Sequence, residues 1–139
     1  MTQEQKEVKL KKEYLKGYEK AVRQMERSEL RLQEVQLSRI CPAVVNGGMP
    51  HAHSNNDLSS YAVQLEREKN KYLKCRYRRI RKCKEITDRI ERLVDEDEKD
   101  VLMYRYIKLL KWVDIREKMG RSLQHIHRIH AKALKNFKM

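Results

Sequence analysis

The stretch that decides the fold of this chain is Trp112-Val-Asp-Ile-Arg-Glu-Lys-Met-Gly120, continued by Arg121-Ser-Leu-Gln-His-Ile-His-Arg-Ile-His130 and Ala131-Lys-Ala-Leu-Lys-Asn-Phe137. A glycine after one helix and a serine before the next are residues that often end and cap helices. Leu123, Ile126 and Ile129 then recur at helical spacing. The stretch therefore predicts a short helix, a turn at Gly120 and a second helix over 122–137, which is the pattern of a helix-turn-helix.

The residues before this stretch predict that it completes a three-helix unit over 95–139. Asp95-Glu-Asp-Glu-Lys-Asp100 places carboxylates where a helix N-terminus favours them. Val101-Leu-Met-Tyr-Arg-Tyr106 follows and supplies the apolar residues of a first helix. We expect the three helices to close a core around Trp112, and the acidic cluster to face away from any DNA.

The first part of the chain predicts two long helices. Residues 1–40 contain no proline. Eight of them follow the alternating spacing of a coiled-coil seam: Tyr14, Tyr18, Ala21, Met25, Ser28, Leu32, Val35 and Arg39. A second helix over 58–94 repeats apolar residues at a heptad position, with Arg79 as the exception, and we expect Asp57 or Ser59 to cap it.

A loop over residues 41–57 connects these two helices, because the segment holds both prolines and two of the four glycines. One such loop reverses the direction of the chain, so we expect the helices to pair antiparallel. The sequence therefore predicts an all-α protein with a coiled-coil-like hairpin or arm, followed by the three-helix unit.

Composition and charge narrow the class of partner. Among 139 residues, 33 Lys and Arg stand against 20 Asp and Glu, which gives a net charge of +13. Such a balance favours a polyanion, and together with the helix-turn-helix pattern it indicates double-stranded DNA. No apolar run approaches the roughly 20 residues of a membrane span, and the N-terminus lacks the apolar segment of a signal peptide. Three cysteines without a CxxC pair indicate reduced thiols in a cytoplasmic protein.

A basic block lies within the second helix. Between Lys71 and Lys84, eight of fourteen residues are Lys or Arg and none is acidic. Such a block repels itself on a bare helix. DNA phosphates, an acidic protein or simple solvation of this face would each relieve the repulsion, and the sequence leaves all three interpretations open.

The helix over 122–137 carries the candidate DNA-binding residues. If its apolar residues point inward, four polar residues point outward toward base edges: Gln124, His125, His127 and Arg128. Glutamine can bond adenine N6 and N7, and arginine can bond guanine O6 and N7. Four basic residues suit DNA phosphates: Arg121, Lys132, Lys135 and Lys138. Pairing of Arg128 with a carboxylate such as Glu117 is the alternative.

No catalytic motif is present in the sequence. The chain has no phosphate-binding loop, nucleophile elbow or HExxH segment, so we expect no enzyme and no cofactor. His51 and His53 in the loop lack a third metal ligand nearby. His125, His127 and His130 have no cysteine or carboxylate beside them, so we expect no bound metal. We expect these three histidines to be polar residues that face the major groove of DNA.

The C-terminal segment resembles region four of bacterial sigma factors, through His125-Ile-His-Arg-Ile-His-Ala-Lys-Ala-Leu-Lys-Asn-Phe137 and the preceding Val101–Tyr106 segment. The resemblance implies a helix that reads promoter DNA through Leu123, Gln124, His125, His127 and Arg128. Four positions depart from the pattern: Lys111 at the N-cap, Arg116 where a small residue is usual, Arg121 after the turn glycine, and Leu123 where the family has an arginine.

The remainder resembles the ArpU-type late-gene transcription regulators of phages and prophages. Gly48-Met-Pro-His-Ala-His-Ser-Asn-Asn-Asp-Leu-Ser-Ser-Tyr61 matches the segment that precedes the long helix in that family. The resemblance implies a sequence-specific transcription regulator in the cytoplasm of a bacterial host. Two alternatives stay open: a module that docks on RNA polymerase, and a DNA-binding subunit of phage packaging, similar to a small terminase. We expect a homodimer formed through the long helices, with a monomeric hairpin as the alternative.

Overall fold

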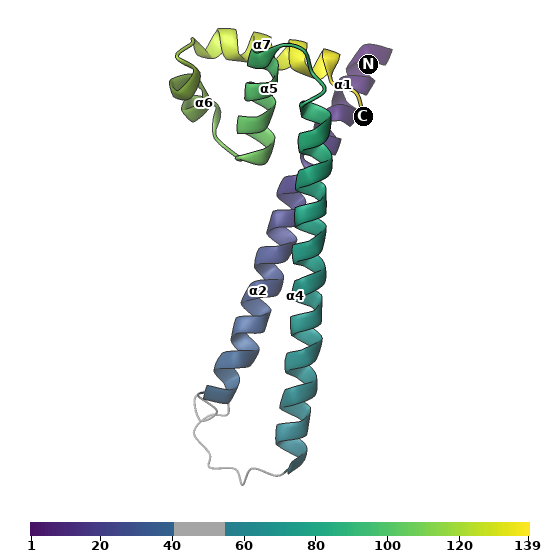
Figure 1. Ribbon diagram of the computed structural model, residues 1–139, viewed down its shortest axis with the longest axis vertical. Coiled ribbons are helices and arrows are strands. Elements are labelled where there is room, and N and C mark those ends of the chain that lie inside the picture. Colours follow the sequence, from purple (N-terminus) through teal and green to yellow (C-terminus); the bar gives the residue numbers. More distant parts are fainter. Residues whose placement is uncertain (41–54) are drawn as a thin grey trace. The chain divides into compact units, whose positions relative to one another are not determined.

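The computed structural model describes the backbone of residues 1–40 and 55–139, and the side chains of residues 1–38 and 58–139. Every element in these ranges is helical, which confirms the predicted all-α class (Figure 1). The elements are α1 (Gln3–Leu15), α2 (Gly17–Ile40), α4 (Asn55–Ile90), α5 (Glu96–Leu102), the π-helix η1 (Met103–Ile107), α6 (Trp112–Met119) and α7 (Leu123–Asn136). None of the described helices is long and apolar enough to cross a bilayer.

Helix bounds differ from the predicted ones at three places. The first helix divides at Lys16 into α1 and α2, next to Gly17, a residue with low helix propensity. Helix α4 already begins at Asn55, so the last three residues of the predicted loop are helical. Asp57 and Ser59 both lie inside the helix, and the prediction that one of them caps it is wrong. It ends at Ile90 rather than at residue 94. The rest of the predicted loop, with His51 and His53, lies outside the described residues.

Contacts divide the chain into two compact units, residues 1–21 with 79–139 and residues 22–78. The core of the first unit is formed by buried side chains of α1, α2, α4, α5, η1, α6 and α7. Within this unit α7 packs against α5, α6 and α1 (Figure 1). The segment 95–139 therefore shares a core with the beginning of the chain. The largest fully buried side chains of this shared core are Leu15, Ile86, Ile90, Leu102, Ile115, Ile126, Leu134 and Phe137. Burying each of them contributes about 1.5–3 kcal/mol to stability.

The pairing of α1 and the start of α2 with the end of α4 is antiparallel, as predicted. Tyr14 Oη donates to Glu85 Oε1 at 2.6 Å, and Arg79 Nη1 donates to Tyr18 Oη at 3.3 Å. The Tyr14 ring also lies 6.1 Å from the Phe137 ring, centroid to centroid. Tyr14 therefore joins α1 to both α4 and the C-terminal end of α7.

The second unit consists of residues 22–40 of α2 and 55–78 of α4, which also run antiparallel. Arg78 Nη1 donates to Gln24 Oε1 at 3.2 Å. Among the described side chains of this unit, Val35 is the buried apolar one. The seam here is polar, because Ser28, Glu68 and Cys75 occupy positions at heptad spacing with apolar neighbours.

Candidate nucleic-acid interface

The turn between α6 and α7 has the geometry that the sequence predicts. Gly120 is left-handed, with φ 63° and ψ 34°, and its N–H donates to Arg116 O at 2.9 Å. Ser122 caps α7, because its Oγ accepts the N–H of His125 at 3.2 Å. Lys111 provides no side-chain cap for α6. An eight-residue helix, a three-residue turn and a fourteen-residue helix therefore follow one another, as in a helix-turn-helix.

The inner face of α7 differs from the predicted one at two residues. Ile126, Ile129, Ala133 and Leu134 are buried as expected. Leu123, which the apolar pattern places inside, is 38% exposed, while His130 is buried at 7% exposure. The expectation that His130 faces outward, toward a DNA groove, is therefore wrong. His130 lies one helical turn after Ile126 and one before Leu134, and this spacing is the sequence signal that could have placed it inside.

A line of exposed residues runs along the opposite face of α7. Gln124, Arg128, Ala131 and Lys135 follow one another at intervals of four, three and four residues, and all four are exposed. Lys132 is exposed beside this line. In the described part of the chain no ion pair involves Arg128, so the alternative pairing with Glu117 is not formed. The structure thus brings Gln124, Arg128 and Lys135 onto one free surface.

The two remaining histidines of the predicted set hold different positions. The His127 ring packs against Trp112, with 4.7 Å between the ring centroids. His125 is half-buried, and its Nε2 lies 3.2 Å from Arg121 Nη1. Both side chains are thus engaged by neighbours within the protein.

Trp112 lies at the edge of the core, and the expectation that the three helices close around it is wrong. Its ring is half-buried, and it packs edge-on to His130 at 4.8 Å between centroids. The guanidinium of Arg105 covers the ring at 4.6 Å from the centroid, and Arg105 Nη1 donates to Leu110 O at 3.0 Å. Arg105 was not among the predicted residues, because a cation over an aromatic ring has no signature in the spacing.

Buried His130 forms a hydrogen bond with η1. Its Nε2 lies 2.8 Å from the hydroxyl of Tyr106, also a buried residue. Burial lowers the pKa of His130 to about 4, and nearby Lys12, His127 and Arg105 act in the same direction. Burial also raises the pKa of Tyr106 to about 12. The imidazole is therefore neutral near pH 7, and the pair anchors α7 from within.

Arg121, one of the predicted phosphate-binding residues, already has an anionic partner. Its Nη2 lies 3.1 Å from Asp97 Oδ2. Asp97 is held in place because its N–H donates to Oδ1 of the helix N-cap Asp95 at 2.8 Å. One residue of the acidic cluster, Asp97, therefore lies beside a residue that the sequence assigns to DNA phosphates.

The three predicted lysines are exposed, but they differ in setting. Lys132 and Lys135 lie on α7, and the carbonyl oxygen of Lys135 accepts a bond from Lys11 Nζ at 3.2 Å. Lys138 lies beyond the end of α7 at Asn136. Among the described residues, no three histidine, cysteine or carboxylate side chains form a group that could hold a metal ion.

The exposed line of α7 carries an amide, a guanidinium and an ammonium group. An arginine fork matches guanine, a glutamine amide matches adenine, and lysines contact phosphates. The chain matches no family model, no curated protein and no solved structure.

Proposed function

We propose that the chain binds double-stranded DNA in a sequence-specific way and regulates transcription. The observation that supports this most is the exposed line of Gln124, Arg128 and Lys135, on a capped helix that follows a tight turn. In helix-turn-helix proteins the second helix enters the major groove with its N-terminal residues toward the bases. Helix α7 supplies polar donors in the same place.

Gln124 and Arg128 are the proposed base-reading residues. They are one turn apart, about 6 Å along the helix axis. This distance corresponds to roughly two base-pair steps of 3.4 Å. The pair can therefore contact base pairs about two steps apart, with the amide on adenine and the guanidinium on guanine. His125 and His127 have a smaller role in the proposal, because Arg121 and Trp112 already engage them.

The proposed phosphate contacts are Lys132, Lys135, Arg121 and Lys138. A formal charge of +13 on the chain supports strong electrostatic attraction to DNA. Neutralising phosphates releases counterions, so affinity should fall steeply as salt rises.

The resemblance to ArpU-type regulators and to sigma region four supports a narrower role. It suggests promoter DNA as the target, phage or prophage genes as the regulated set, and the cytoplasm of a bacterium as the location. Residues 48–54, which carry part of this resemblance, lie outside the described residues.

Selection of preferred sequences from a random pool of duplexes tests this proposal. The full chain should enrich a short motif that contains adjacent or nearly adjacent A·T and G·C pairs. Recovery of a random pool, despite measurable binding, would rule out a sequence-specific regulator. Lys135→Ala serves as the control, because a phosphate contact carries no sequence information and the enriched motif should persist.

Docking on RNA polymerase or on a phage packaging complex is a second candidate. Val113 on α6 is 51% exposed and Leu123 at the start of α7 is 38% exposed, and such apolar side chains suit a protein surface. Under this second candidate, Val113→Ser should leave DNA affinity unchanged and should reduce binding to purified RNA polymerase.

A further inference from the structure

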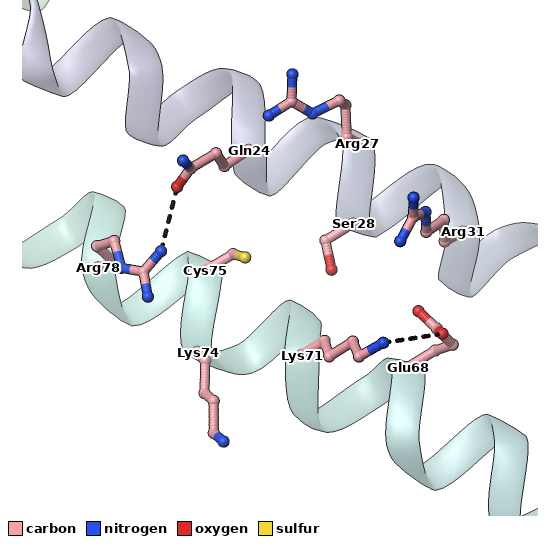
Figure 2. Close-up of a pocket in the computed structure, with 9 residues that line it drawn as sticks. All are labelled: Gln24, Arg27, Ser28, Arg31, Glu68, Lys71, Lys74, Cys75 and Arg78. Atoms are coloured by element: carbon pink, nitrogen blue, oxygen red, sulfur yellow. Dashed lines mark hydrogen bonds and ion pairs between the residues drawn. The ribbon is translucent and has the colours of Figure 1, made fainter.

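A basic groove lies in the second unit, between α2 and α4 (Figure 2). Its volume is about 410 Å³. The groove is lined by Gln24, Arg27, Ser28 and Arg31 from α2, and by Glu68, Lys71, Lys74, Cys75 and Arg78 from α4. None of the residues that the proposed function uses belongs to it.

The hollow exists because small side chains meet where a coiled coil usually places large apolar ones. Ser28 and Cys75 face the space between the two helices (Figure 2). Both are at heptad positions, and neither is long enough to fill the gap between the backbones. The groove is thus a consequence of the seam sequence.

The charge of the groove is strongly positive. Five of its lining residues are Lys or Arg and one is Glu, so five minus one leaves +4. The single carboxylate, Glu68, reaches Lys71 at 3.7 Å. Arg78 donates to the neutral amide of Gln24. Within the described residues, Arg31 has no ion pair.

Like charges on both walls repel one another along each helix. Arg27 and Arg31 are four residues apart on α2, and Lys74 and Arg78 are four residues apart on α4. Pairs of equal sign at this spacing destabilise a helix. A bound polyanion would remove this repulsion on both helices at once.

We propose that this groove binds the phosphate backbone of a nucleic acid without regard to base sequence. The Arg78 guanidinium reaches across to Gln24 of α2, the Lys71 ammonium lies beside Glu68, and Arg31 lies on the α2 side, while Arg27 and Lys74 extend away from the facing helix (Figure 2). Guanidinium forks match phosphate oxygens in a bidentate way. The lining of α4 from Lys71 to Arg78 extends about 10 Å along the helix, close to three 3.4 Å steps of a duplex strand.

A nucleic acid fits better than an acidic protein because the positive charge continues beyond the groove. The block from Lys71 to Lys84 contains no acidic residue. The exposed Arg76 and Arg81 extend the positive charge along α4. Phosphates recur at regular intervals along a strand and can follow such a block, whereas carboxylates of a protein are interspersed with other side chains.

This inference rests on the proposed function only in taking DNA as the ligand. It concerns a different pair of helices, and base reading by α7 does not require it. A variant of the groove should therefore weaken all duplexes and leave the preferred sequence unchanged.

The test compares two triple variants with equal loss of charge in the same unit. The groove variant is Arg31→Gln, Lys71→Gln and Arg78→Gln. The control variant is Arg23→Gln, Arg67→Gln and Lys69→Gln, three exposed residues outside both the lining and the Lys71–Lys84 block. The measurement is fluorescence anisotropy with a random-sequence 20-base-pair duplex over a range of salt concentrations, with circular dichroism to verify that both variants are folded.

We expect the groove variant to lose about tenfold in affinity, and the slope of log affinity against log salt to fall by roughly 2 to 3. The control should stay within about twofold, since more distant charges are screened. Equal losses in both variants would show that only net charge matters and would overturn the proposal. Loss of duplex binding through α7 substitutions alone, with no effect of the groove variant, would overturn it and leave the proposed function intact.

A poly-glutamate probe distinguishes the acidic-protein alternative. If the groove variant loses affinity for poly-glutamate and keeps its affinity for the duplex, the groove binds acidic protein and the proposal is wrong. If the wild-type chain binds no duplex at all, the proposed function and this inference both fail.

A second pair of variants tests the groove without removing cations. Glu68→Gln removes the one carboxylate of the lining, and Glu66→Gln removes an exposed carboxylate outside it. We expect Glu68→Gln to raise duplex affinity about threefold more than Glu66→Gln, because a nearby like charge no longer repels the phosphate. Equal effects of the two substitutions would contradict the proposal.

Discussion

Arg121, in the turn before α7, forms an ion pair with Asp97 in the first turn of α5, with 3.1 Å between Nη2 and Oδ2. Both side chains are about two-fifths exposed, at 43% and 41%. An exposed pair of this kind contributes little to stability. Its effect on binding is larger, since Asp97 occupies a guanidinium that the proposed function assigns to a DNA phosphate.

Asp97→Asn should therefore strengthen DNA binding. Without the carboxylate, Arg121 is released and the negative charge nearest to the turn is gone. We expect affinity to rise about two- to fivefold, the range that the energy of an exposed ion pair allows. Anisotropy titrations against Asp88→Asn, an exposed residue of α4 with the same charge change, provide the comparison. An equal gain in both variants would assign the effect to net charge and not to the pair.

The pKa of His130 predicts how stability depends on pH. The pKa is about 4 in the folded chain and 6.5 in the unfolded one, so unfolding takes up a proton between these values. The free energy of unfolding should therefore fall as pH drops from 6.5 to 4, by about 2–3 kcal/mol from this residue. Urea titrations of the wild type and His130→Phe measure the difference. The Phe variant should lose this part of the acid sensitivity, and His125→Gln should retain it.

Local spacing predicts the all-helical class and the turn before α7, but not the division of the first helix at Lys16. Gly120 and Ser122 act on their immediate neighbours, so their roles are visible in the sequence. The burial of His130 is different, because its hydrogen-bond partner Tyr106 lies 24 residues away. A polar residue on an apolar face is stable only with such a partner, and spacing does not identify the partner.

Contacts between residues far apart in the sequence explain why the packing of α1 on α7 and the position of Trp112 were not predicted. Lys11 and Lys135 are 124 residues apart and are joined by a hydrogen bond. No periodic pattern indicates that the first helix packs on the last, because both apolar faces would equally suit other partners. Trp112 lies at the edge of the core for a similar reason: Arg105 and His127 cover its ring, and neither belongs to an apolar pattern.

Gly120 and Gly17 should respond in different ways to substitution by alanine. Gly120 has φ 63°, and a Cβ there would meet nothing within 4 Å. The cost of Gly120→Ala is therefore purely conformational, about 1 kcal/mol. At Gly17 a Cβ would lie 2.8 Å from Cε of Lys82, the mobile end of a side chain that can move away. Gly17→Ala should thus be neutral or stabilising by a few tenths of a kcal/mol. Urea unfolding measures both, and equal destabilisation would contradict the assigned turn geometry.

We also predict that the chain forms a dimer through its second unit. Leu30 and Leu37 are one heptad apart on α2 and are 59% and 58% exposed. Their burial against a second copy would complete a seam that has little core of its own. Light scattering should then give twice 16.8 kDa for the wild type. Leu30→Glu with Leu37→Glu should give the monomer, and Leu10→Glu on α1 should not. A wild-type mass of 16.8 kDa at micromolar concentration would instead establish the monomeric hairpin.

The last prediction separates base contacts from phosphate contacts on α7. Arg128 and Lys135 are both exposed and lie seven residues apart on the same face. Arg128→Ala should cost about 1–3 kcal/mol on the preferred site and relax the preference at one base pair, because the guanidinium fork distinguishes guanine from other bases. Lys135→Ala should weaken every duplex equally and lower the salt slope by about 1. Competition titrations with single-base variants of the site measure both effects. A changed preference with Lys135→Ala, and none with Arg128→Ala, would mean that α7 does not read DNA in this orientation.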